Sequence, residues 1–112
     1  MEKNITLANA FSIQMCCSLP CKVNFVEKSI NEMKKIVVDE STTKIISAIG
    51  HIDTAAVVSN LLEVEVPPNR INISLQKGDV IYVAQVVGGR LPEGSTTLPE
   101  NFKMKFIEVI VE

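Results

Sequence analysis

Two apolar runs in the second half of the chain, Val80–Val87 and Lys103–Val111, place the strongest limit on its fold. The first is short, is rich in β-branched residues and is closed by Gly88-Gly89, so we interpret it as a strand. In the second, apolar residues alternate, with a change of parity at Phe106-Ile107 that predicts either a bulge or a strand buried on both faces. A chain that holds both runs is expected to build a β-sheet.

The beginning of the chain predicts a strand, a helix and a second strand. Ile5 and Leu7 indicate the first strand, which runs into Asn9–Ser12, and the last residue of that stretch is a candidate N-cap for a helix. Pro20 ends this helix because proline cannot continue it. The second strand is expected to start near Cys21.

The region 27–41 allows two interpretations. The charge spacing in 29–36 favours a helix, whereas the run Ile36-Val37-Val38 favours a strand. The sequence leaves both open.

Two short helices are expected in the middle of the chain. Thr42 or Thr43 caps the first, which Gly50 ends, and Asp53 or Thr54 caps the second. The apolar positions expected on their buried faces are Ile45, Ile46, Ile49, Val57, Val58, Leu61 and Leu62.

The region after Pro67-Pro68, where a helix is excluded, is interpreted as one arm of an antiparallel hairpin. Apolar residues alternate in 71–75, Lys77-Gly78-Asp79 supplies a turn, and Val80–Val87 returns. The predicted fold class is therefore α/β (α+β), a mixed sheet of about five strands flanked by short helices that lie mainly in the first half.

The length and charge of the chain limit the number of domains and the kinds of ligand that we expect. With 112 residues the chain can bury one core, so residues 1–112 are expected to form a single domain. The formal net charge of -2 argues against a surface for duplex nucleic acid but leaves room for a small anionic ligand. No apolar run is long enough to span a membrane, and Met1–Asn4 does not resemble a secretory signal. We therefore expect a cytoplasmic protein.

Three cysteines, Cys16, Cys17 and Cys21, lie on one short segment. An odd number of this kind favours reduced thiols over a disulfide framework. A structural zinc site needs four ligands, and no fourth cysteine or histidine lies nearby, so no metal is expected.

His51 is the only histidine and thus the only side chain that naturally titrates near neutral pH. It stands where a helix is expected to begin, an end that attracts anions, and Gly50 before it lets a ligand approach the backbone. The only arginines, Arg70 and Arg90, offer the planar donors suited to phosphate, and Glu93 can hold the second guanidinium.

Each of these features also has a structural interpretation. The loop 88–97 has the composition of a plain surface turn, and a lone histidine at a helix start often only satisfies backbone groups. The sequence contains no Walker loop, dinucleotide fingerprint or zinc-protease motif. Taken together with Asn9–Ser12 at another strand end, the three regions favour phosphoryl chemistry without a metal.

A set of short motifs follows one another along the chain. They are Leu7-Ala8-Asn9-Ala10-Phe11-Ser12-Ile13, Ala48-Ile49-Gly50-His51, Thr54, Asn69-Arg70-Ile71, Tyr82-Val83-Ala84-Gln85, Arg90-Leu91-Pro92-Glu93-Gly94 and Phe106-Ile107-Glu108-Val109. In order and approximate spacing they resemble the viral anti-CRISPR ring nucleases and their cellular relatives, with only about 27–44 unmatched. That family forms dimers with a mixed sheet flanked by helices, and it destroys cyclic tetra-adenylate, the second messenger of type III CRISPR antiviral defence.

The resemblance implies a role for each matching residue. It makes His51 the general acid, with Arg90 and Glu93 completing the reaction centre. The substrate-binding residues that it implies are Asn9, Ser12, Gln14, Thr54, Arg70 and Gln85.

Three positions depart from the family pattern. The chain has His51-Ile52-Asp53-Thr54 where the family usually has His-Asp-Ser-Thr. Gln14 stands where asparagine is common, and the stretch between Gln85 and Arg90 is one residue longer than usual.

The resemblance implies a metal-independent phosphodiesterase that needs no cofactor, because each ribose of the ring carries a 2′-hydroxyl nucleophile beside a linking phosphate. The products are linear di-adenylates ending in a 2′,3′-cyclic phosphate, and a homodimer supplies two histidines for the two cuts. A non-catalytic module that sequesters the ring, and a small structural dimer, are the alternatives.

Overall fold

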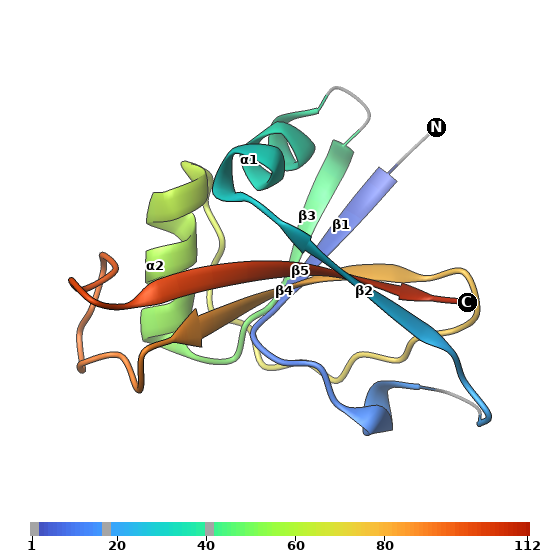
Figure 1. Cartoon of the computed structure of the whole chain (residues 1–112). Helices are drawn as coiled ribbons and strands as arrows, with labels where there is room; N and C mark the ends of the chain where they lie inside the picture. The colour runs from blue at the N-terminus through green and yellow to red at the C-terminus, as the bar shows by residue number, and fades with distance from the viewer. Residues whose placement is uncertain (1–2, 17–18, 40–41) are drawn as a thin grey trace.

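The two apolar runs form neighbouring antiparallel strands in a five-stranded mixed sheet of order β2-β5-β4-β1-β3 (Figure 1). The computed structural model describes residues 3–16, 19–39 and 42–112. The strands are β1 (Lys3–Ala8), β2 (Val23–Lys28), β3 (Thr42–Ala48), β4 (Val80–Val87) and β5 (Lys103–Val111). The predicted fold class, a mixed sheet with short helices, is confirmed.

Both faces of the sheet are covered by apolar side chains. Helices α1 (Ile30–Val38) and α2 (Ile52–Leu62) pack on one face, and their buried residues share a core with β1, β4 and β5. The short 3₁₀ helix η1 (Ile13–Met15) and the segment 71–79 cover part of the other face. No helix in the described parts of the chain is both long and apolar enough to cross a membrane.

Strand β5 is buried on both faces. Met104 and Phe106 point toward the helices, whereas Val109 and Val111 belong to a second apolar cluster on the other face of the sheet. Its pairing with β4 runs without a register shift, so the change of parity at Phe106-Ile107 reflects two apolar faces and not a bulge.

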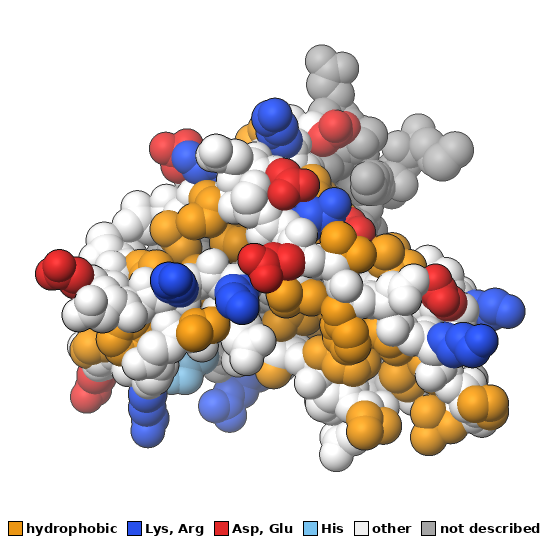
Figure 2. All heavy atoms as spheres, in the orientation of Figure 1, with side chains coloured by type: hydrophobic (Ala, Val, Ile, Leu, Met, Phe, Trp, Pro, Cys, Tyr) orange, Lys and Arg blue, Asp and Glu red, His pale blue; other side chains and the backbone are white. Residues whose placement is uncertain are grey.

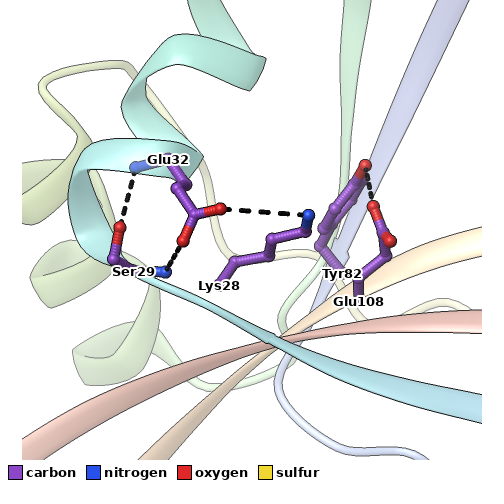
Figure 3. A network of polar contacts seen from close by, with 5 residues as sticks. All are labelled: Lys28, Ser29, Glu32, Tyr82 and Glu108. Carbon is purple, nitrogen blue, oxygen red and sulfur yellow. Dashed lines mark hydrogen bonds and ion pairs between the residues drawn. The ribbon is translucent and has the colours of Figure 1, made fainter.

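The ambiguous region 27–41 contains helix α1. Ser29 is its N-cap: the hydroxyl accepts from the Glu32 amide at 3.1 Å, and the Glu32 carboxylate accepts from the Ser29 amide at 3.0 Å (Figure 3). These bonds form a capping box, and they hold the pKa of Glu32 below its usual value. Met33 and Val37 form the buried face.

The helix expected over Ile45–Ile49 is wrong, because this stretch is β3 and its end. The isoleucine spacing fits both periods, but β-branched residues favour a strand. Pairing with β1 decides the outcome: β3 runs parallel to it from Thr42 to Ala48. Gly50 therefore lies in the turn from β3 to α2.

Helix α2 begins earlier than predicted. Its N-cap is His51, and neither Asp53 nor Thr54 holds that position. The predicted buried face is confirmed for Val57, Val58 and Leu62.

The predicted hairpin of 71–75 with Val80–Val87 is also wrong. Strand β4 is paired with β1 on one side and with β5 on the other, so no edge remains for a third partner. Within 71–75 only Leu75 forms a bridge, and its partner is Cys16.

The helix predicted between Ser12 and Pro20 is reduced to one turn. Ser12 caps it as predicted, but η1 ends at Met15. The second strand, predicted near Cys21, begins at Val23. Cys17 lies outside the described residues.

Tyr82 and Glu108 form a polar pair across β4 and β5. The Tyr82 hydroxyl donates to Glu108 Oε2 at 2.9 Å (Figure 3), and only 7% of the tyrosine is exposed. Burial first, and then the carboxylate, disfavour the tyrosinate and raise the pKa of Tyr82 from 10.0 to about 12.

We expect the ultraviolet absorbance of tyrosinate to show this shift directly, because Tyr82 is the only tyrosine and the chain has no tryptophan. The midpoint should lie near 12 in the folded protein and near 10.0 in denaturant. Since the folded-state pKa is raised, the free energy of unfolding should fall as pH rises through this window.

Glu108→Gln is the matched control for this titration. It should lower the midpoint only part of the way, because burial is the larger cause. A folded-state midpoint near 10.0 would contradict the pairing.

Candidate functional site

The ends of three parallel strands meet at one edge of the sheet. β1 lies between β3 and β4 and runs parallel to both, so Ala8, Ala48 and Val87 end their strands in the same direction. In α/β sheets, ligands bind beyond the carboxyl ends of strands at such a switch point. The residues that follow these strands form the candidate site.

The Gly50 peptide unit is held from two sides. Asn9 Oδ1 accepts from the Gly50 amide at 3.3 Å, and Arg70 Nε donates to the Gly50 carbonyl at 3.2 Å. The Asn69 amide donates to the Ile49 carbonyl at 2.8 Å, which fixes the backbone just before Arg70. Two residues predicted from the sequence, Asn9 and Arg70, are thereby brought to the start of α2.

His51 follows directly as the N-cap of α2. Its side chain makes no capping hydrogen bond, so the first amides of the helix lack that partner. Its Nδ1 is buried and has no hydrogen-bond partner among the described residues. A buried unpaired nitrogen is costly, about 1–3 kcal/mol, and therefore rare. The imidazole thus lines the hollow described next without a hydrogen bond from the described residues to its Nδ1.

A hollow of about 840 Å³ brings together four of the predicted residues, His51, Arg70, Arg90 and Glu93. A smaller hollow of about 330 Å³ shares His51 and Arg90 and adds Asn9 and Thr54. Figure 2 shows the histidine (pale blue) near Lys or Arg side chains (blue) at the lower edge of that view. The arrangement supplies two guanidinium groups, a helix start and one imidazole, a set suited to an anionic ligand.

The loop 88–102 carries Arg90 and Glu93 into this hollow. Leu91 is buried in the core, and the Gly94 amide donates to Asp53 Oδ1 at 3.2 Å. Arg90 and Glu93 were predicted to form an ion pair, but the ion pairs found within the described residues do not include one between them. Leu91 and Asp53 position the loop instead.

Asp53 is a site residue that the sequence reasoning missed. The sequence indicates Asp53 only as a helix cap and as a departure from a family motif, whereas in the structure it lines the large hollow. An acidic residue in the first turn of a helix, facing a glycine-rich loop, is the pattern that could have identified it, because its carboxylate can accept from loop amides.

Three predicted residues line neither of the two hollows beside His51. Gln85 lines a separate hollow of about 310 Å³ together with Asn9, Phe11 and Phe25. Ser12 and Gln14 are exposed and line neither hollow beside His51. The Ser12 hydroxyl accepts from the Gln14 amide at 3.2 Å, which is a local cap of η1.

The acidic side chains of the site do not gather into a cation cluster. Asp53 and Glu93 line the large hollow, but no group of three or more His, Cys, Asp or Glu side chains suited to a metal occurs within 3–16, 19–39 and 42–112. The charged side chains that line the large hollow are two guanidinium groups and two carboxylates, beside one imidazole.

A family model described as STIV B116-like matches residues 5–109. Uncharacterized protein 26 of Sulfolobus islandicus filamentous virus (isolate Iceland/Hveragerdi) is 40% identical over 68 residues, which are 61% of this chain and 54% of that protein. The chain thus spans about half the length of that relative. Uncharacterized protein ORF116 of Acidianus filamentous virus 1 (isolate United States/Yellowstone) is 29% identical over 102 residues, 89% of this chain and 83% of that protein.

The solved structure of B116 of Sulfolobus turreted icosahedral virus superposes with a TM-score of 0.78 at 24% identity. The match covers 96% of this chain and 99% of that one. It shows that the two chains share a fold.

Gly50→Ala should separate Arg70 from the Gly50 carbonyl, because an added Cβ would lie 2.8 Å from Arg70 Cγ. We expect a loss of about 1 kcal/mol in the free energy of unfolding, measured in urea. In an Arg70→Ala background the same substitution should cost almost nothing. An equal cost in both backgrounds would contradict this contact.

Proposed function

This chain belongs to the STIV B116-like family, and its motifs resemble those of the ring nucleases, so we propose that it cleaves cyclic tetra-adenylate. The products are linear di-adenylates with a 2′,3′-cyclic phosphate, and no metal takes part. Such an activity switches off type III CRISPR signalling in the cytoplasm of the host cell.

The observation that carries the proposal is the position of His51. Its Nδ1 is buried without a partner at a helix start, and it shares a hollow with both arginines of the chain. Residues far apart in sequence, from 51 to 93, bring one imidazole and two guanidinium groups to one space. A purely structural histidine would be expected to have a hydrogen-bond partner within the protein.

In the proposed reaction the protein aligns a nucleophile that the substrate already holds. The ribose 2′-oxygen attacks the neighbouring phosphorus, and the bond to the 5′-oxygen breaks. Arg90 stabilises the charge on the pentavalent phosphorus, and Glu93 accepts the proton of the 2′-hydroxyl. His51 donates a proton to the leaving 5′-oxygen.

The remaining predicted residues bind the ring. Arg70 and Asn9 flank the Gly50 peptide beside His51, and Thr54 lines the smaller hollow. Gln85, in the adjoining hollow, contacts a base. Ser12 and Gln14, which line neither hollow beside His51, contact the ring from outside these hollows.

A homodimer completes the proposal. One chain has one histidine, whereas a ring with a fourfold repeat must be cut twice to give two equal halves. A twofold axis would place two such sites on one ring. Strand β2 is an edge of the sheet open to pairing with a second copy, and its Phe25 (59%) and Val26 (40%) are exposed on opposite faces.

Incubation of the purified protein with cyclic tetra-adenylate in excess EDTA, followed by separation of the products, tests the proposal. Di-adenylates with a cyclic phosphate support it. Tight binding of an intact ring would instead favour the sequestering module. The absence of both cleavage and binding would favour a structural protein. Sedimentation of the same preparation reports whether two chains associate.

His51→Ala should lower single-turnover cleavage by about 10²- to 10⁴-fold, because no other side chain near the helix start can serve as the acid. Binding of the ring should change much less. Ile52→Ala is the control: its side chain is 72% exposed and lines the same hollow without acid–base chemistry. Cleavage near the wild-type rate by the histidine variant would exclude His51 from the mechanism.

Arg90→Ala should weaken both binding and cleavage, because a guanidinium binds phosphate in the ground state and in the transition state. Arg90→Lys should restore only part, since an ammonium lacks the bidentate geometry. Lys77→Ala, which removes one charge in the remote turn before β4, controls for the loss of charge. A silent Arg90→Ala would show that the loop holds this side chain away from the ring.

A further inference from the structure

Two of the three cysteines lie in contact, away from the His51 site. Cys21 Sγ is 3.5 Å from Cys16 Sγ, and both residues are half-buried. A disulfide needs sulfurs about 2.05 Å apart, so the two atoms are about 1.5 Å from bonding distance. Thiols at this separation need only a small side-chain movement to be joined.

The backbone on each side of the pair is anchored separately. On the Cys16 side, the Leu75 amide donates to the Met15 carbonyl at 2.6 Å and Cys16 bridges to Leu75. On the Cys21 side, the Glu112 amide donates to the Lys22 carbonyl at 2.9 Å as β2 begins. The two sulfurs are therefore brought together by the fold as well as by the short segment between them.

An aromatic contact joins the same two segments a second time. The rings of Phe11 and Phe25 meet edge to face, with centroids 5.6 Å apart. Phe11 precedes η1 and Phe25 lies in β2, so this contact and the cysteine pair connect the same two pieces of chain. Both rings line the hollow that holds Gln85.

We propose that Cys16 and Cys21 form a reversible intramolecular disulfide by exchange with a low-molecular-weight disulfide. One thiolate attacks a sulfur of that disulfide and expels one thiolate, which leaves a mixed disulfide. The second cysteine thiolate attacks the protein sulfur and expels the other. In total the two cysteines lose two protons and two electrons, and the small disulfide is reduced to two thiols.

The bond would act locally. It closes a very short loop, so its effect on the free energy of unfolding is small compared with that of a long-range disulfide. Its main effect is to hold η1 against the start of β2, and with it the wall formed by Phe11 and Phe25. This inference does not depend on the proposed nuclease activity.

The test uses the full chain with Cys17→Ser, in which only Cys16 and Cys21 remain as thiols. After equilibration with oxidised and reduced glutathione, a trypsin digest gives the peptide 4–22, which holds both cysteines. We expect this peptide to lose two hydrogens and to carry no glutathione. Glutathione attached to either cysteine in place of the bridge would overturn the proposal.

A matched condition separates a positioned pair from mere proximity in sequence. In urea, where the fold no longer holds Cys16 beside Cys21, the Cys17→Ser chain should form the bridge at least about tenfold less at the same glutathione ratio. Equal bridging in the folded and in the unfolded chain would overturn the proposal. The wild-type chain needs no substitution: once bridged, it should be alkylated at Cys17 alone, and alkylation at Cys16 or Cys21 would contradict the pairing.

Discussion

Strand β1 is hydrogen-bonded to β3 on one side and to β4 on the other, and it runs parallel to both. This pairing determines where the candidate site lies, because the three chain segments that follow these strands must leave the sheet at the same edge. The segment after β1 supplies Asn9, the one after β3 supplies His51, and the one after β4 supplies Arg90. The antiparallel strands β5 and β2 extend the sheet away from these strands. They contribute side chains to the second apolar cluster, on the face of the sheet away from the helices.

Local sequence patterns correctly predicted the elements whose apolar spacing fits only one kind of structure, either a strand or a helix. The alternation of Lys103–Val111 and the buried stripe of α2 belong to this class. Ile45, Ile46 and Ile49 fit a helix and a strand equally well, and only the hydrogen-bonding edge offered by β1 selects the strand. The 71–75 segment alternates like a strand, but both edges of β4 are occupied by partners that local patterns do not reveal.

The site shows the same division. His51, Arg70, Arg90 and Glu93 were chosen by residue chemistry, and the fold brings them to one hollow. Only the resemblance makes Ser12 and Gln14 substrate-binding residues, and here they form a local cap, the role that the sequence itself predicts for Ser12. Asp53 was not chosen because its role depends on the Gly94 amide, which approaches it only when the loop folds back on α2. The sequence shows an acidic residue at the start of a helix, but its partner 41 residues later depends on tertiary structure.

The connection 88–102 joins two antiparallel strands whose pairing begins at Val87 and Lys103 and continues without interruption. Everything between these residues lies outside the sheet, and Leu91 and Asp53 hold it from the core and from α2. Away from these two anchors its length and composition can therefore change without moving a strand register. Such a change would reshape the wall of the large hollow while the histidine and the Gly50 peptide stay in place.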